Sequence, residues 1–123
     1  MKPPPDPERS RAYLRGLSAE FTCVMLLRVK GYRILARRFR SAAGEIDIIA
    51  RRGRVIAAIE VKARATLNQA LEAVSNRQQR RIVQTLLYFQ ARRPEFADLD
   101  YRFDLMWVAP RRLPKHIVDA WRE

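Results

Sequence analysis

The sequence has one cysteine in 123 residues, so it cannot form an intramolecular disulfide. That residue, Cys23, lies in an apolar helical stretch, and we interpret it as a core residue rather than a catalytic one. Chains that fold without disulfides are typical of reducing compartments, which predicts a cytoplasmic protein. The cysteine count therefore excludes a disulfide-stabilised secreted scaffold.

Long apolar runs are also missing. The longest, residues 21–27, is far shorter than the ~20 residues that span a bilayer, and it lies too far along the chain for a signal peptide. The sequence therefore predicts no membrane partner. Hydrophobic residues still make up 48% of the chain, which at this length suits one domain with one core.

Acidic residues are few: 13 Asp and Glu stand against 25 Lys and Arg, for a net charge of +12. Of the basic residues 21 are arginine, whose planar guanidinium binds phosphate oxygens in pairs. Such a surface concentrates polyanions, and nucleic acid is the leading candidate partner. The charge does not select DNA over RNA, and a solvated basic surface from an arginine-rich genome is the alternative.

The chain divides into three segments by composition. We predict a disordered, proline-rich leader at residues 1–9, a folded domain at 10–109, and a tail at 110–123 that contains a short helical turn near residues 117–121. Within the domain, hydrophobic periodicity predicts helices and strands in the order α-β-β-β-α-β. The predicted ranges are helix 8–30, strands 32–39, 45–50 and 55–63, helix 67–92, and strand 102–108. This order predicts an α/β fold.

Two acids interrupt the two most apolar predicted strands, Asp47 in the first and Glu60 in the second. Burial of an unpaired carboxylate is costly, so acids inside strands usually lie at an edge or bind a metal. If Arg52 and Gly53 form the connecting turn, Asp47 and Glu60 become diagonal neighbours on one face, about 7–8 Å apart at the backbone. Lys62 shares that face. A register shifted by one residue would separate the two acids.

Two carboxylates at this distance can bind one hard divalent ion, since Mg²⁺ takes one or two carboxylates together with waters and phosphate oxygens. Asp47 and Glu60 would supply the carboxylates, and the Val61 carbonyl a further oxygen. Lys62 would orient or help deprotonate a water, or neutralise charge on a phosphate. The alternative is a simple Glu60–Lys62 ion pair on a half-exposed strand. The apolar strand, the position of Asp47 and the basic charge favour the metal site.

Each predicted helix carries one polar residue in its apolar stripe. Glu20 interrupts the first stripe, which contains Tyr13 and Leu17, and is either a further metal ligand or a residue at the stripe's border. Gln78 lies on the inward face of the second helix. It either holds a water or phosphate oxygen or is a satisfied core amide. His116, the single histidine, has no evident partner and is assigned no role.

The outer face of the second helix is basic. It predicts a track for backbone phosphates, although a solvated helix face is nearly as good an interpretation. We predict that nucleic acid contacts Arg64, Arg77, Gln78, Arg80 and Arg81.

The chain resembles a known family at several separate segments: Ala19-Glu20, Gly31–Leu35, Gly44–Ala50, Glu60–Arg64, Glu72–Val74 and Arg102–Asp104. These are similar to the UPF0102 (YraN-like) family of bacterial proteins and, more broadly, to the PD-(D/E)xK nuclease superfamily. The similarity covers about residues 12–108. The specific part of the pattern is Gly44–Asp47 followed, thirteen residues after Asp47, by Glu60–Lys62.

The resemblance implies a restriction-endonuclease-like core, with a mixed central sheet flanked by helices, and metal-dependent cleavage with Mg²⁺ or Mn²⁺. By position, Glu20, Asp47, Glu60 and Lys62 match the active-site pattern. Holliday-junction resolvases share this core, so DNA, and structured DNA in particular, is the implied substrate. Two positions depart from the family pattern: Arg38 replaces an expected Asn, and Gln78 an expected Lys.

Three hypotheses follow. The first is a Mg²⁺- or Mn²⁺-dependent phosphodiesterase acting on DNA. The second is a nucleic-acid-binding module whose nuclease centre is silent. The third is a subunit that cuts only with a protein partner, and a homodimer is one form that such an assembly can take.

Overall fold

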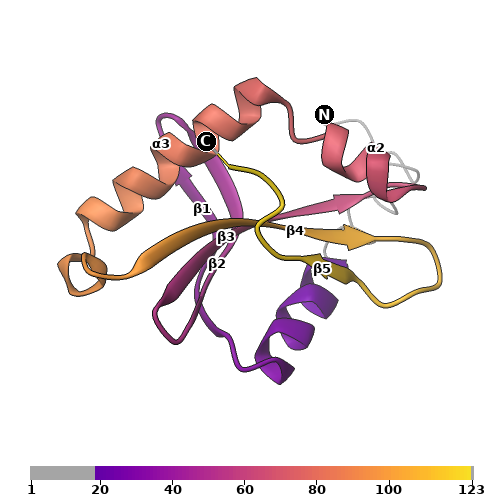
Figure 1. The fold of residues 1–123 in the computed structure, drawn as a ribbon, viewed down its shortest axis with the longest axis horizontal. Coiled ribbons are helices and arrows are strands. Elements are labelled where there is room, and N and C mark those ends of the chain that lie inside the picture. Colours follow the sequence, from indigo (N-terminus) through magenta and orange to yellow (C-terminus); the bar gives the residue numbers. More distant parts are fainter. Residues whose placement is uncertain (1–18, 123) are drawn as a thin grey trace, which may run out of the picture.

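Five strands form one mixed sheet with a helix on each face (Figure 1). The structure is a computed structural model, and it describes residues 19–122. Residues 19–29 are helical and precede the first strand. The remaining elements in chain order are β1 (Arg33–Ser41), β2 (Gly44–Arg52), β3 (Val55–Ala63), α2 (Leu67–Glu72), α3 (Asn76–Ala91), the 3₁₀ turn η1 (Pro94–Phe96), β4 (Asp100–Val108) and β5 (Lys115–Ile117).

The strands lie in the order β1-β2-β3-β4-β5. All neighbours are antiparallel except β3 and β4, which run parallel. A parallel pair needs a crossover connection, and α2 and α3 provide it. The predicted α/β class, the mixed sheet and the order α-β-β-β-α-β are confirmed.

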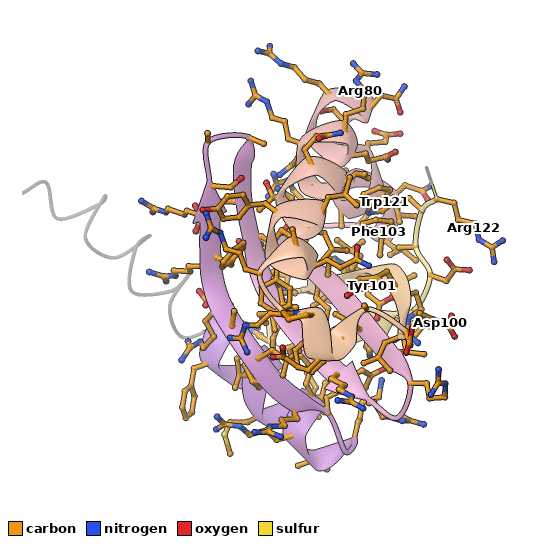
Figure 2. All side chains as sticks on the ribbon, turned by 90° about the vertical axis from the view of Figure 1, so that its left-hand side faces the viewer. Arg80, Asp100, Tyr101, Phe103, Trp121 and Arg122 are labelled. Atoms are coloured by element: carbon orange, nitrogen blue, oxygen red, sulfur yellow. The ribbon has the colours of Figure 1, made fainter. Side chains whose placement is uncertain are left out.

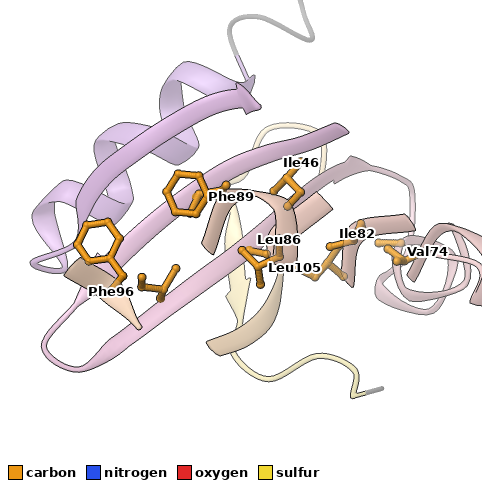
Figure 3. Close-up of a cluster of buried hydrophobic side chains, with 11 residues drawn as sticks. Ile46, Val74, Ile82, Leu86, Phe89, Phe96 and Leu105 are labelled. Carbon is orange, nitrogen blue, oxygen red and sulfur yellow. The ribbon is translucent and has the colours of Figure 1, made fainter. Parts of the chain in front are cut away.

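The sheet buries a separate apolar cluster on each face. Toward α3 the cluster includes Ile46, Ile82, Leu86, Phe89 and Leu105 (Figure 3). Toward the N-terminal helix it includes Cys23, Val24, Leu27, Ile48 and Ile59. Cys23 is fully buried, and its burial, with the nearby charges of Glu20 and Asp47, raises the pKa of its thiol to about 12. The interpretation of this cysteine as a core residue is confirmed.

The N-terminal helix ends at Gly31, as predicted. Its backbone has φ 91°, a conformation that glycine adopts without strain, and the Tyr32 N–H donates to the Leu27 carbonyl at 2.9 Å. The leader and the predicted stripe residues Tyr13 and Leu17 lie outside the described residues. No helix within residues 19–122 is both long enough and apolar enough to cross a membrane.

The predicted helix at 67–92 is wrong as a single element, because it is divided into α2 and α3. Ser75 has extended backbone angles, and its hydroxyl accepts a hydrogen bond from the Gln78 N–H at 3.1 Å. A serine that caps a new helix in this way competes with continuation of the preceding one. The N-cap Ser75 therefore lies three residues before Gln78. Gln78 is in the first turn of α3, where some backbone N–H groups have no partner within the helix.

The predicted helical turn at residues 117–121 is also wrong. Residues Lys115–Ile117 form β5, which pairs antiparallel with β4 through Met106 and His116. Beyond β5 the chain continues along β4, and the Ala120 N–H donates to the Phe103 carbonyl at 2.8 Å. Pairing with a strand distant in sequence replaces the local helix because it satisfies the exposed edge of the sheet.

Candidate active site

The β2–β3 hairpin positions both candidate carboxylates, with a register that differs from the predicted one. Arg52 pairs with Val55, so Gly53 and Arg54 form the turn, and Gly53 has φ 59°. The whole register is therefore shifted by two residues. Because side chains alternate with a period of two, a shift of two keeps the same residues on the same face.

Asp47 and Glu60 lie against each other where β2 and β3 separate. The last paired residues before them are Ile48 and Ile59. Beyond that point side chains replace backbone pairing: the Asp47 N–H donates to Glu60 Oε2 at 3.1 Å, and the Val61 N–H donates to Asp47 Oδ2 at 2.8 Å. The two carboxylates are closer together than the predicted diagonal arrangement required.

Burial of this pair raises the pKa of both carboxylates. Glu60 is only 3% exposed, and its pKa rises to about 8 because of its burial first and the adjacent Asp47 charge second. The pKa of Asp47 is also raised, chiefly by burial. The positive charge of Lys62 lowers the pKa of each, which places that lysine close to both. Without a cation, the pair holds a proton at neutral pH.

Gln78 is the third group at the site. Its side-chain Nε2 donates to Glu60 Oε1 at 3.1 Å, from the first turn of α3. Its predicted inward orientation is therefore confirmed, and Glu60 accepts a hydrogen bond on each oxygen. The first turn of a helix also presents unpaired backbone N–H groups, so α3 brings positive electrostatic potential toward this end of the carboxylate pair.

Glu20 lies near the pair but is held by two arginines. Arg38 Nε donates to its Oε2 at 3.0 Å, and Arg37 Nε lies 3.4 Å from its Oε1. Oε1 is buried and has no hydrogen bond within the described chain, so its contact with Arg37 is electrostatic only. Glu20 raises the pKa of Asp47, which shows that its charge reaches the site. Its role as a direct or water-mediated ligand stays a prediction.

A bend in β1 brings these arginines to the site. Arg38 has φ 51°, which is uncommon for a residue other than glycine. Arg37 and Phe39 would share a face of a regular strand, but Arg37 contacts Glu20 whereas Phe39 packs edge-on against Phe89 of α3. The bend therefore places Arg37 and Phe39, which are two residues apart, on opposite faces of the sheet, where a regular strand would place them on the same face.

The other predicted nucleic-acid contacts are four exposed arginines. Arg77, Arg80 and Arg81 are exposed on α3, as is Arg64 after β3. Three described surface hollows lie at the start of β4 and the tail, between α3 and the tail, and between α3 and the β1–β2 turn, and neither Asp47 nor Glu60 lines these three.

The donor set fits one kind of metal. Within residues 19–122 no cluster of three or more His, Cys, Asp or Glu side chains is arranged to hold an ion. Structural zinc sites need four such ligands, whereas Mg²⁺ and Mn²⁺ sites commonly use one or two carboxylates, with water and substrate oxygens completing the shell. Asp47 and Glu60 fit the second kind, and the Val61 carbonyl stays a predicted further ligand.

A second polar cluster, on Asp104, was missed by sequence reasoning. Asp104 is fully buried and accepts hydrogen bonds from Arg102 Nε at 2.8 Å and Nη2 at 2.7 Å, from His116 Nε2 at 2.7 Å and from the Asp119 N–H at 2.9 Å. Burial alone would raise the pKa of Asp104, but the hydrogen bonds from His116 and Arg102 lower it overall. The sequence did contain one signal for this cluster, because Asp104 is an acid within the apolar strand predicted at residues 102–108.

Residues 19–108 match the family described as "Uncharacterised protein family UPF0102". A UPF0102 protein of Parvibaculum lavamentivorans is 53% identical over 111 residues, which cover 90% of this chain and 84% of the relative. One from Rhodopseudomonas palustris is 53% identical over 119 residues, 97% of this chain and 92% of the relative. One from Paramagnetospirillum magneticum is 49% identical over 123 residues, covering 97% and 95%.

Proposed function

This chain belongs to the UPF0102 family, and we propose that it is a divalent-metal-dependent phosphodiesterase that acts on DNA in the cytoplasm. The observation that carries the proposal is the buried contact of Asp47 with Glu60 beside Lys62. Two acids placed in contact inside a protein of net charge +12 destabilise the fold unless they serve a cation. The exposed arginines around them supply the attraction for a polyanion.

Each residue has a distinct role in this proposal. Asp47 and Glu60 hold Mg²⁺ or Mn²⁺, which supplies a Lewis acid for the phosphate and lowers the pKa of bound water. Lys62 orients the attacking water or neutralises the charge that develops on the phosphate. Gln78 fixes the Glu60 carboxylate by its hydrogen bond, and the α3 arginines hold the backbone on either side.

One observation favours a binding module as the second candidate. Glu20 is neutralised by Arg37 and Arg38, and Gln78 occupies one oxygen of Glu60. Both contacts reduce the number of free carboxylate oxygens that a cation can use. A protein in which they persist binds nucleic acid through the same arginines without turnover.

Cleavage of labelled single-stranded, duplex and four-way-junction DNA tests the proposal. We expect the wild-type protein to cut at least one substrate in Mg²⁺ or Mn²⁺ and none in a chelator, because the carboxylates need a cation to act. Asp47→Ala should lose cleavage and keep DNA binding. Glu45→Ala is the matched control, since Glu45 lies on the same strand but is exposed, and its ion pair among the described residues is with Arg40 at the surface.

Cleavage by a folded Asp47→Ala protein would refute the site assignment. Salt-sensitive binding of DNA by the wild type, with no cleavage in either metal, would favour the binding module.

Metal binding itself should release a proton. At pH 7 the pair still holds one, because the pKa of Glu60 is about 8, and a bound cation needs both carboxylates ionised. We expect close to one proton per metal ion, measured by titration calorimetry in buffers with different ionisation enthalpies. Glu60→Gln should remove the release. A metal-binding enthalpy that does not change with the buffer would contradict the proposed ligands.

A further inference from the structure

A small hollow lies between the first turns of α3 and the C-terminal segment. Figure 2 labels three of its lining residues, Arg80 on α3 and Trp121 and Arg122 on the tail. Its volume is about 240 Å³, which limits it to one flat ring system. It is lined by Asn76, Gln79, Arg80, Val83, Trp121 and Arg122.

The tail side of the hollow is fixed firmly to the sheet. Trp121 stacks on Phe103, with ring centroids 4.2 Å apart and planes 19° from parallel. The Ala120 N–H donates to the Phe103 carbonyl at 2.8 Å, and the Asp119 N–H donates to the buried Asp104 at 2.9 Å. The indole is therefore held in place before any ligand arrives, which reduces the entropy lost on binding.

The lining offers the groups that recognise a nucleobase. Trp121 supplies an aromatic surface, and its Nε1 is buried with no hydrogen-bond partner within residues 19–122. Gln79 uses its Nε2 to bind the Val74 carbonyl at 3.1 Å, which leaves its side-chain oxygen as an acceptor. Asn76, exposed at the first position of α3, adds a second amide. The two side-chain amides, and not the buried indole N–H, are therefore the groups that can pair with the edge of a base.

The charges beside the hollow are unequal. Arg122 is paired with Asp119, with Nη2 2.6 Å from Oδ2, so its charge is partly neutralised. Arg80 is exposed and makes no ion pair within the described part of the chain, so it remains available to a phosphate. A neighbouring hollow of about 370 Å³ is lined by two acids, Asp100 and Asp119, and by two arginines that pair with acids, Arg102 and Arg122, so it offers phosphate no free positive charge. A nucleic-acid backbone is therefore favoured on the Arg80 side.

We propose that this hollow binds one unpaired nucleobase of a DNA strand against Trp121, with the adjoining phosphate on Arg80. The inference rests on the proposed function and adds a preference for substrates with a single-stranded segment. Gln78, which contacts Glu60, lies between Asn76 and Gln79 in the same helical turn. The first turns of α3 therefore contribute side chains both to the hollow and to the carboxylate pair, from different sides of the helix. Bases in a duplex are stacked on both sides and cannot enter.

Binding in a chelator, where no cleavage occurs, tests the subsite separately from catalysis. The probes are a labelled single-stranded oligothymidylate and a blunt duplex of the same length, followed by fluorescence anisotropy. We expect Trp121→Leu to weaken single-strand binding about tenfold, because stacking of a base on an aromatic side chain is lost. Duplex binding should change little. Arg80→Gln should weaken single-strand binding more than Arg28→Gln, which removes the same charge from the helix on the other face of the sheet.

Trp121→Phe guards against an effect of misfolding, since a phenyl ring can still stack on Phe103, whereas the five-membered ring of the indole and its N–H are removed. It should retain most of the single-strand affinity. Equal single-strand affinity of folded Trp121→Leu and wild type would overturn the subsite and leave the nuclease proposal standing. Trp121-dependent binding without cleavage in any metal would support the subsite and overturn the nuclease proposal. Failure of the wild type to bind either probe at low salt would overturn both.

Discussion

Replacing Glu60 with glutamine should stabilise the metal-free protein at pH 8 and abolish its cleavage of DNA. The gain in stability and the loss of activity both come from removal of the ionised Glu60 carboxylate. A carboxylate that is 3% exposed and beside Asp47 is unfavourable to the fold when ionised, and it is the same ionised group that would bind a cation. An amide of the same shape removes the charge. It can still accept from the Asp47 N–H, while Gln78 can rotate its own amide to accept the new N–H.

The sign of the pH dependence follows from the raised pKa. An unfolded Glu60 loses its proton near pH 4.5, whereas the folded protein keeps it until about pH 8. Between these values the folded state holds the extra proton, so rising pH favours unfolding. The slope for one proton is at most about 1.4 kcal/mol per pH unit. The contribution of the protonated pair is present below pH 4.5 and is lost as the pH rises through 8.

Urea unfolding in a chelator, from pH 5 to pH 8.5, measures this effect. We expect the free energy of unfolding of Glu60→Gln to exceed that of the wild type by about 1–3 kcal/mol at pH 8 and to show a flatter pH profile. The control is Glu45→Gln, at an exposed position of β2, which should follow the wild-type profile. A Glu60→Gln profile that is as steep as the wild type would show that Glu60 is not the group that holds the proton.

The placement of Asp47 and Glu60 on one face was predictable, because any register shift by an even number of residues leaves each side chain on the same face. Apolar alternation predicted both strands. The turn lies one residue further along, at Gly53–Arg54 instead of Arg52–Gly53, which shifts the register by two residues and leaves each acid on the same face. The separation of β2 and β3 beyond Ile59 was not predictable. It arises because carboxylates replace backbone partners there, and the shifted register puts Asp47 opposite Glu60 and not diagonal to it.

The bend at Arg38 could not be read from the sequence. Positive φ is favoured by glycine and asparagine, and arginine carries no such signal. Its consequence is the pairing of Arg37 and Arg38 with Glu20, which decides how much of that acid is left for a metal. The division of the long helix was partly visible, because Ser75 is a good capping residue, but periodicity continues across the break.

The tail depended on contacts between positions far apart along the chain. His116 had no visible partner because Asp104 lies on another strand and Lys30 in the turn after the N-terminal helix. β5 forms only once β4 is in place, and no local pattern in three residues can specify a strand. Long-range pairing therefore determined both the fold of the tail and the position of Trp121.

Substituting Asp104 should produce the largest loss of stability in this chain. Removing one partner of a buried, hydrogen-bonded charge pair costs about 3–5 kcal/mol, because the remaining charge keeps its desolvation penalty. In Asp104→Ala, Arg102 loses both of its hydrogen bonds to the carboxylate and His116 loses its acceptor. Since the pKa of Asp104 is lowered from 3.8, its contribution in the wild type is present above that pH and is lost in stronger acid.

Urea unfolding at pH 7 measures the loss, and Asp104→Asn provides a second variant that keeps the shape and part of the hydrogen bonding. We expect Asp104→Asn to lose less stability than Asp104→Ala. Asp119→Asn, which removes an exposed charge and keeps a residue that tolerates φ 55°, should change little. Hydrogen exchange should be faster across residues 115–122 in both Asp104 variants, since the Asp119 N–H loses its acceptor or has a weaker one. Because Trp121 is held by the same segment, single-strand binding should weaken as well. Unchanged exchange in this segment would show that strand pairing and the Phe103–Trp121 stack hold the tail without Asp104.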